Sequence, residues 1–71
     1  MKSQINFTTV EGIKAWAKSV YEKGGHWVYE CWSDEDIKLF IRHRKDGREV
    51  RRDLYKYIKE MNAYEKEIKS A

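Results

Sequence analysis

The chain has 71 residues, of which 38% are charged, with a net charge of +3 and no proline. This length suits one small domain, 1–71, and no stretch approaches the roughly 20 consecutive apolar residues of a membrane span. No apolar run follows the N-terminus and Cys31 is the single cysteine, so we expect neither a signal peptide nor a disulfide scaffold. These features predict a cytoplasmic protein whose core relies on its three Trp, five Tyr and two Phe rings.

The first predicted helix covers residues 9–23. Thr8 can accept a hydrogen bond from the amide of residue 11 while Glu11 reaches back, which is the pattern of a capping box. Apolar residues then recur every three or four positions and form one stripe: Val10, Ile13, Ala17, Val20 and Tyr21. Gly24-Gly25 ends this helix, because glycine readily takes the left-handed conformation of a C-cap.

Residues 26–32 fit two different structures. The apolar residues at the odd positions 27, 29 and 31 favour a strand, which would pair with residues 4–8 in a small two-stranded β element. As a helix, the segment would instead present one apolar face, made of Trp27, Val28, Cys31 and Trp32. The glycine pair before it favours the strand. In both cases we expect its rings and Cys31 to be buried.

Two further helices are predicted. Ser33 can cap a helix over 34–44 that carries three carboxylates in its first turn, and Asp46-Gly47 breaks it. The third helix has apolar residues at steps of 4, 3, 4, 3 and 4: Val50, Leu54, Tyr57, Met61, Tyr64 and Ile68. Its end should project beyond the other helices, and 66–71 should fray. The expected fold is a mainly α, compact three-helix domain.

All five arginines lie in one window, 42–52, together with Lys45 and only two carboxylates. Six cations less two anions give this window a charge of +4, while the whole chain carries +3. Guanidinium groups match phosphate oxygens in a bidentate way, and a second helix after a tight turn can enter the DNA major groove. The first hypothesis is therefore a DNA-binding surface of helix-turn-helix type, formed by Arg42, Arg44, Lys45, Arg48, Arg51, Arg52, Lys56 and Lys59.

A second hypothesis explains the same residues without nucleic acid. The charges suit an ordinary solvated helix face, and cations at the start of the third helix oppose its dipole. The chain would then be a protein-interaction domain or a small homo-oligomer that uses the heptad end of the third helix. No acid–base or nucleophilic arrangement appears, and His26, Cys31 and His43 match no zinc spacing. We therefore expect no enzymatic activity, cofactor, metal, membrane or small-molecule substrate.

Overall fold

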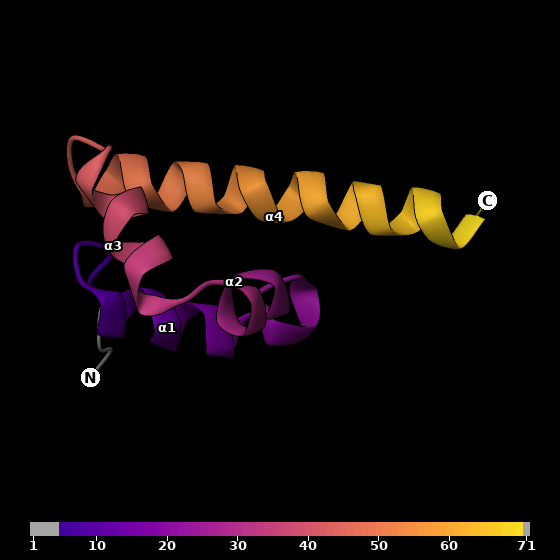
Figure 1. Cartoon of the computed structure of the whole chain (residues 1–71), viewed down its shortest axis with the longest axis horizontal. Helices are drawn as coiled ribbons and strands as arrows, with labels where there is room; N and C mark the ends of the chain where they lie inside the picture. The colour runs from indigo at the N-terminus through magenta and orange to yellow at the C-terminus, as the bar shows by residue number, and fades with distance from the viewer. Residues whose placement is uncertain (1–4, 71) are drawn as a thin grey trace.

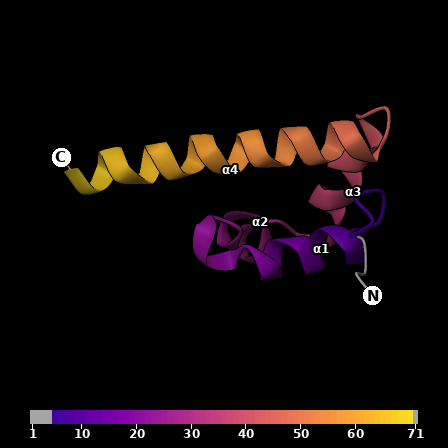
Figure 2. The same cartoon turned by 180° about the vertical axis from the view of Figure 1, so that it is seen from behind.

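The computed structural model describes residues 5–70, which contain four α-helices and one turn of 3-10 helix. In chain order these are α1 (Val10–Ser19), the 3-10 turn η1 (Tyr21–Lys23), α2 (His26–Cys31), α3 (Asp34–Arg42) and α4 (Gly47–Ser70). Figure 1 shows α1 and α2 in one layer and α4 as a long helix in a second layer, with α3 linking the two layers at one end. The view from behind in Figure 2 shows the same two layers. The mainly helical prediction is confirmed.

The start of α1 lies one residue later than predicted. Thr9, not Thr8, is the N-cap, and its hydroxyl accepts a hydrogen bond from the Gly12 amide at 3.1 Å. Thr8 is engaged elsewhere, because its amide and its hydroxyl both donate to the side chain of Asn6. The helix ends at Ser19, and the residues predicted to continue it form η1. Gly24, with φ = 113°, takes the predicted left-handed conformation, but it ends η1 and not α1.

Residues 26–31 form the helix α2, so the predicted strand is wrong and the helical alternative is correct. No strand occurs in residues 5–70, and of the expected partner segment, 4–8, residue 4 lies outside this range. Residues 5–8 turn back towards α1 instead, and Phe7 sets its ring edge-on to Trp16 with centroids 5.8 Å apart. Without a neighbouring strand, residues 26–31 satisfy their backbone groups by local helical hydrogen bonds.

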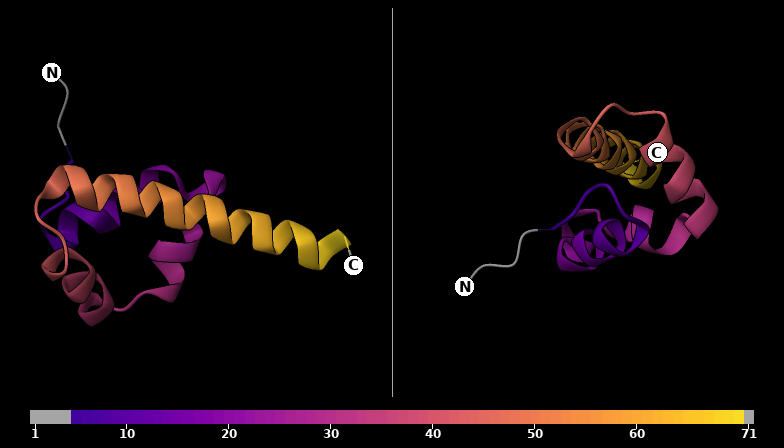
Figure 3. Two further views of the ribbon diagram at one scale, coloured as in Figure 1. Left: turned by 90° about the horizontal axis from the view of Figure 1, so that it is seen from above. Right: turned by 90° about the vertical axis from the view of Figure 1, so that its left-hand side faces the viewer.

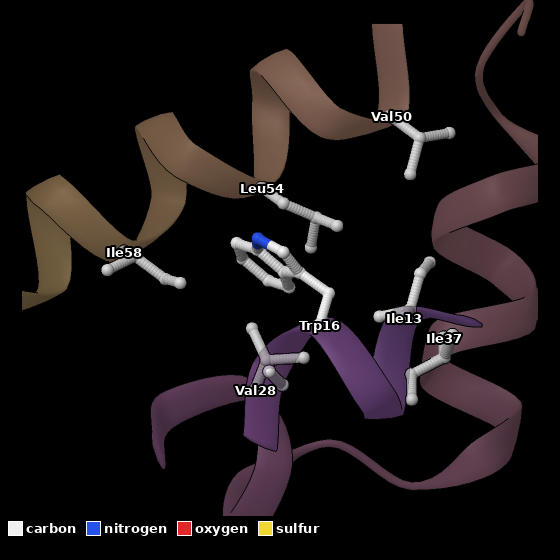
Figure 4. Packing of buried hydrophobic residues seen from close by; sticks show 8 residues of the cluster. Ile13, Trp16, Val28, Ile37, Val50, Leu54 and Ile58 are labelled. Atoms are coloured by element: carbon white, nitrogen blue, oxygen red, sulfur yellow. The ribbon is translucent and has the colours of Figure 1, made fainter. Parts of the chain in front are cut away.

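The core joins all four α-helices. Among the residues that the structure describes, it consists of eight buried side chains: Ile13, Trp16, Ala17, Val28, Ile37, Val50, Leu54 and Ile58. Figure 4 shows Trp16 reaching from α1 towards α4, where Leu54 and Ile58 face it. The indole N–H groups of Trp27 and Trp32, which are half-buried, donate to side chains of α4. Burial was predicted for this aromatic run, but Tyr29 and Cys31 are exposed, because α2 turns them away from α4.

The capping prediction for α3 is confirmed. Ser33 accepts from the Asp36 amide, and Asp36 accepts from the Ser33 amide in return, at 3.2 and 3.1 Å. Ile37 from this helix enters the core. Figure 3 shows that α3 is steeply inclined to α4 and ends near its first turn. The short connection 43–46 turns the chain from one helix into the other.

The packing of α4 against the rest of the fold extends from its start to Asn62 in the described residues. Val50, Leu54 and Ile58 are buried, whereas Tyr64 and Ile68 are 55% and 56% exposed. Figure 1 shows the second half of the helix extending past α1 and α2, as the heptad spacing predicted. Fraying of 66–71 stays a prediction. In residues 5–70, no helix combines the length and the apolar character that crossing a membrane requires.

Candidate nucleic-acid interface

The eight predicted cations lie at the end of the molecule where α3 passes into α4. Arg42 ends α3, Arg44 and Lys45 belong to the connection, and the other five lie on α4 between positions 48 and 59. All five cations on α4 are exposed. Arg48, Arg52, Lys56 and Lys59 point away from the buried stripe of that helix, and Arg51 lies at the edge of the stripe. We call these five residues the basic face. No other helix covers this side of α4 in Figures 1 and 2.

The two carboxylates inside the arginine window bind backbone amides instead of arginines. Asp46 Oδ1 accepts a hydrogen bond from the Glu49 amide at 3.0 Å, so it caps the start of α4. Glu49 Oε1 accepts from the Lys45 amide at 3.3 Å. Among the eight cations, only Arg44 and Arg52 come within 4.0 Å of a carboxylate in the part of the chain that the structure describes. The local positive charge is therefore left largely uncompensated.

Arg44 differs from the other seven cations because its side chain is only partly exposed and contacts both α3 and α4. Its Nε lies 3.0 Å from Asp53 Oδ2, and its Nη1 donates to the Phe40 carbonyl oxygen at 3.0 Å. The guanidinium carbon also lies 3.5 Å from the centre of the Phe40 ring, a cation–π contact. Its side chain is only 23% exposed. These contacts join α3 to α4, so Arg44 holds the two helices together.

Within the described residues, Asp53 is the one carboxylate that two arginines share. Burial raises the pKa of Asp53, but hydrogen bonds from Arg52 and Arg44 lower it by more, so this pKa lies below its usual value. A carboxyl whose pKa falls on folding stabilises the folded state above its unfolded pKa of about 3.9. That stabilisation disappears as the pH falls through the lower, folded pKa. The Arg44–Asp53 contact is therefore expected to weaken in acid.

Asp53→Asn should make the stability of the protein less sensitive to acid. The wild-type free energy of unfolding should fall as the pH drops below about 4, and the variant should show a shallower fall, because asparagine does not titrate. Urea titrations at a series of pH values measure the two slopes. Glu22→Gln, which removes an exposed carboxylate from η1, serves as the control and should keep the wild-type slope. Equal slopes for Asp53→Asn and wild type would contradict this assignment.

A groove of about 880 Å³ lies at the N-terminal end of the basic face. Arg48, Arg51 and Tyr55 line its α4 side, and residues 5–8 with the edge of Trp16 line the other. The Arg51 guanidinium lies over the Tyr55 ring at 4.9 Å, and the Tyr55 hydroxyl accepts a hydrogen bond from Trp16 Nε1 at 3.0 Å. A core tryptophan thus positions the ring that supports an exposed arginine.

Residues 5–8 were not among the predicted site residues. Asn6 and Thr8 supply polar atoms to the same groove as Arg48, although they are about 40 positions away in the chain. No local spacing pattern relates segments so far apart, so only the packing of the segment onto α1 and α4 could reveal this neighbourhood.

Comparison with known proteins leaves the site to be interpreted from its own geometry. No protein-family model, curated protein or solved structure matches the chain. Within residues 5–70, no three His, Cys, Asp or Glu side chains gather in a way that could hold a metal ion.

Proposed function

We propose that this protein binds DNA through the basic face of α4. The observation that carries the proposal is a line of exposed cations on the side of α4 opposite its core stripe, with few carboxylates to neutralise it. Arg48, Arg52, Tyr55 and Lys59 recur at steps of 4, 3 and 4, so they follow one side of the helix. Arg51 and Lys56 widen that line on either side.

The dimensions of the basic face suit a DNA groove. Arg48 and Lys59 are 11 positions apart, which corresponds to about 16 Å along a helix. The major groove of B-DNA, about 12 Å wide, accepts one α-helix. The free side of α4 and the short α3–α4 connection resemble the arrangement in which a second helix enters this groove. In this position Arg48 and Arg51 would approach base edges, and Lys56 and Lys59 would contact phosphates.

Two exposed cations near the α3–α4 connection, Arg42 and Lys45, extend the same positive surface. Arg42 and Lys45 are exposed and have no ion-pair partner among residues 5–70, so they would supply further phosphate contacts. Arg44 would contribute to DNA binding indirectly. It shares Asp53 with Arg52 through hydrogen bonds, so this carboxylate neutralises less of the Arg52 charge. The three tryptophans are buried or half-buried, and their indole N–H groups donate to side chains of α4, so they do not form a competing exposed aromatic surface.

Replacing Arg48 and Arg51 together by alanine should weaken DNA binding by at least about tenfold, because two bidentate phosphate or guanine contacts disappear. The slope of log affinity against log salt should become shallower by up to about 1.8, since each phosphate contact contributes about 0.9. Fluorescence anisotropy with a labelled DNA duplex, at salt concentrations from about 50 to 200 mM, measures both quantities.

The matched control is Lys18→Ala with Lys23→Ala. This pair removes the same two charges from exposed positions on α1 and η1, in the layer away from α4 (Figure 1). Its affinity and salt slope should stay close to those of the wild type. Undetectable binding of the wild type at low salt would exclude the proposal. Equal losses in the two double variants would show that only net charge matters, and would exclude a defined face.

A further inference from the structure

The far end of α4 carries an apolar stripe that the fold leaves uncovered. Asn62 is the last residue tied to the other layer, since its side chain accepts from Trp27 Nε1 and donates to the Lys23 carbonyl at 3.0 and 3.2 Å. Beyond it α4 continues for eight residues, about 12 Å. We call residues 63–70 the overhang. Tyr64 and Ile68 within it are the most exposed large hydrophobic side chains in the described part of the chain.

The exposed residues continue the line of the core along the helix. Val50, Leu54, Tyr57, Met61, Tyr64 and Ile68 follow the a and d positions of a heptad pattern. Single exposed apolar residues are ordinary in a soluble protein. Here, however, the stripe keeps its register after the partner layer has ended, which is the pattern of a helix that packs against another helix.

The charges beside the stripe identify which kind of helix can pack there. In heptad notation, the positions that flank the stripe from Met61 to Ile68 are all glutamates: Glu60 and Glu67 at g, and Glu65 at e. None of these three carboxylates has an ion-pair partner within 4.0 Å among residues 5–70. Lys69 lies at b, away from the seam. The stripe is therefore bordered by uncompensated negative charge on both sides.

A second copy of the chain is a poor partner for this surface. In a parallel pair of helices, g positions face e positions, which would set Glu60 against Glu65 of the other copy. In an antiparallel pair, g faces g and e faces e, so glutamates would again oppose glutamates. Like charges in such positions disfavour pairing. A helix with Lys or Arg at its own e and g positions would instead complement the overhang.

We infer that the overhang is a docking site for an amphipathic helix of another protein, whose apolar stripe is flanked by basic residues. The partner would pack on Tyr64 and Ile68 and pair with the flanking glutamates. This surface lies on the opposite side of α4 from the basic face, so both could be occupied at once. The inference does not depend on DNA binding, because it uses neither the same residues nor the same charge.

Two synthetic helical peptides test this inference with the full-length chain. Both have leucines at a and d over three heptads, and one carries lysine and the other glutamate at e and g. Fluorescence anisotropy should show saturable binding of the lysine peptide and at least about tenfold weaker binding of the glutamate peptide. A lysine peptide of the same composition in scrambled order should also bind at least about tenfold more weakly.

Substitutions in the overhang locate the binding surface. Tyr64→Ser with Ile68→Ser should weaken binding of the lysine peptide at least about tenfold, while Ala63→Ser, on a side of the overhang away from the stripe, should leave it unchanged. Glu60→Lys with Glu67→Lys should invert the preference between the two peptides. All five substituted positions are exposed, so circular dichroism of each variant should match the wild type.

Three results would overturn the inference. The first is equal affinity for the lysine and glutamate peptides. The second is unchanged affinity in the Tyr64→Ser, Ile68→Ser variant. The third is concentration-dependent dimerisation of the wild-type chain in sedimentation equilibrium that this variant abolishes, which would identify a second copy as the occupant.

Discussion

Replacing Trp16 by alanine is expected to leave most of the chain unfolded at room temperature. Trp16 is 2% exposed and fills the space between α1 and α4 (Figure 4). Truncating a buried tryptophan to alanine costs about 3–5 kcal/mol, partly from lost burial and partly from the cavity. A core of this size supplies only about 3–5 kcal/mol of net stability. The loss is therefore comparable with the whole free energy of folding.

Trp16→Phe provides the matched control for that result. Phenylalanine keeps an aromatic ring in the core, but it cannot donate the hydrogen bond that Trp16 Nε1 makes to the Tyr55 hydroxyl. This variant should fold, with a loss of about 1–2 kcal/mol from the hydrogen bond and the smaller ring. Far-ultraviolet circular dichroism and urea titration distinguish the two variants. A Trp16→Ala protein with the wild-type urea midpoint would contradict the assigned role of this ring.

The second large effect is expected for Gly24→Ala. Gly24 has φ = 113°, a conformation that residues with a Cβ rarely adopt and that costs them about 1–2 kcal/mol. A Cβ at this position would also overlap Ile58 Cγ2 and lie 2.5 Å from Asn62 Nδ2 on α4. Relieving that overlap adds about 1–3 kcal/mol, as overpacking generally does. The expected total, about 2–5 kcal/mol, should appear as a lower midpoint in thermal and urea unfolding.

Gly47→Ala is the matched substitution at a tolerant site. Gly47 opens α4, and a Cβ there would meet only side-chain atoms, Thr8 Cγ2 at 3.3 Å and Phe7 Cβ at 3.7 Å. We expect its stability to change by no more than about 0.5 kcal/mol. Similar losses of stability in Gly24→Ala and Gly47→Ala would contradict this explanation. They would show that neither the left-handed backbone of Gly24 nor its contact with α4 makes a glycine necessary there.

Long repeating patterns in the amino-acid order were sufficient to predict most of the helical framework. The heptad line of α4 extends over about twenty residues, and the α1 stripe covers three turns, so tertiary contacts had little scope to override either pattern. Local chemistry was equally reliable at Ser33 and Gly24, because a cap or a left-handed stop involves only neighbouring residues.

The sequence pattern did not correctly predict the conformation of the six residues of α2. An apolar run this short satisfies the strand pattern and the helix pattern equally well, and its outcome depended on whether a second strand lay nearby. Residues 5–8 instead pack over Trp16, and α2 became helical. The exposure of Cys31 follows from the same choice, because the helical turn points it away from α4.

For the candidate site too, the sequence indicated one part and the tertiary structure decided the rest. The arginine cluster and its separation from the apolar stripe are evident in the order of residues, because a helix places positions three and four apart on one side. Folding alone distinguished the cations from one another. Arg44 became a link to Asp53 and Phe40, while Arg48 and Arg51 came to face a groove walled by residues 5–8. These differences arise from contacts between segments distant in the chain, which packing creates and no local spacing records.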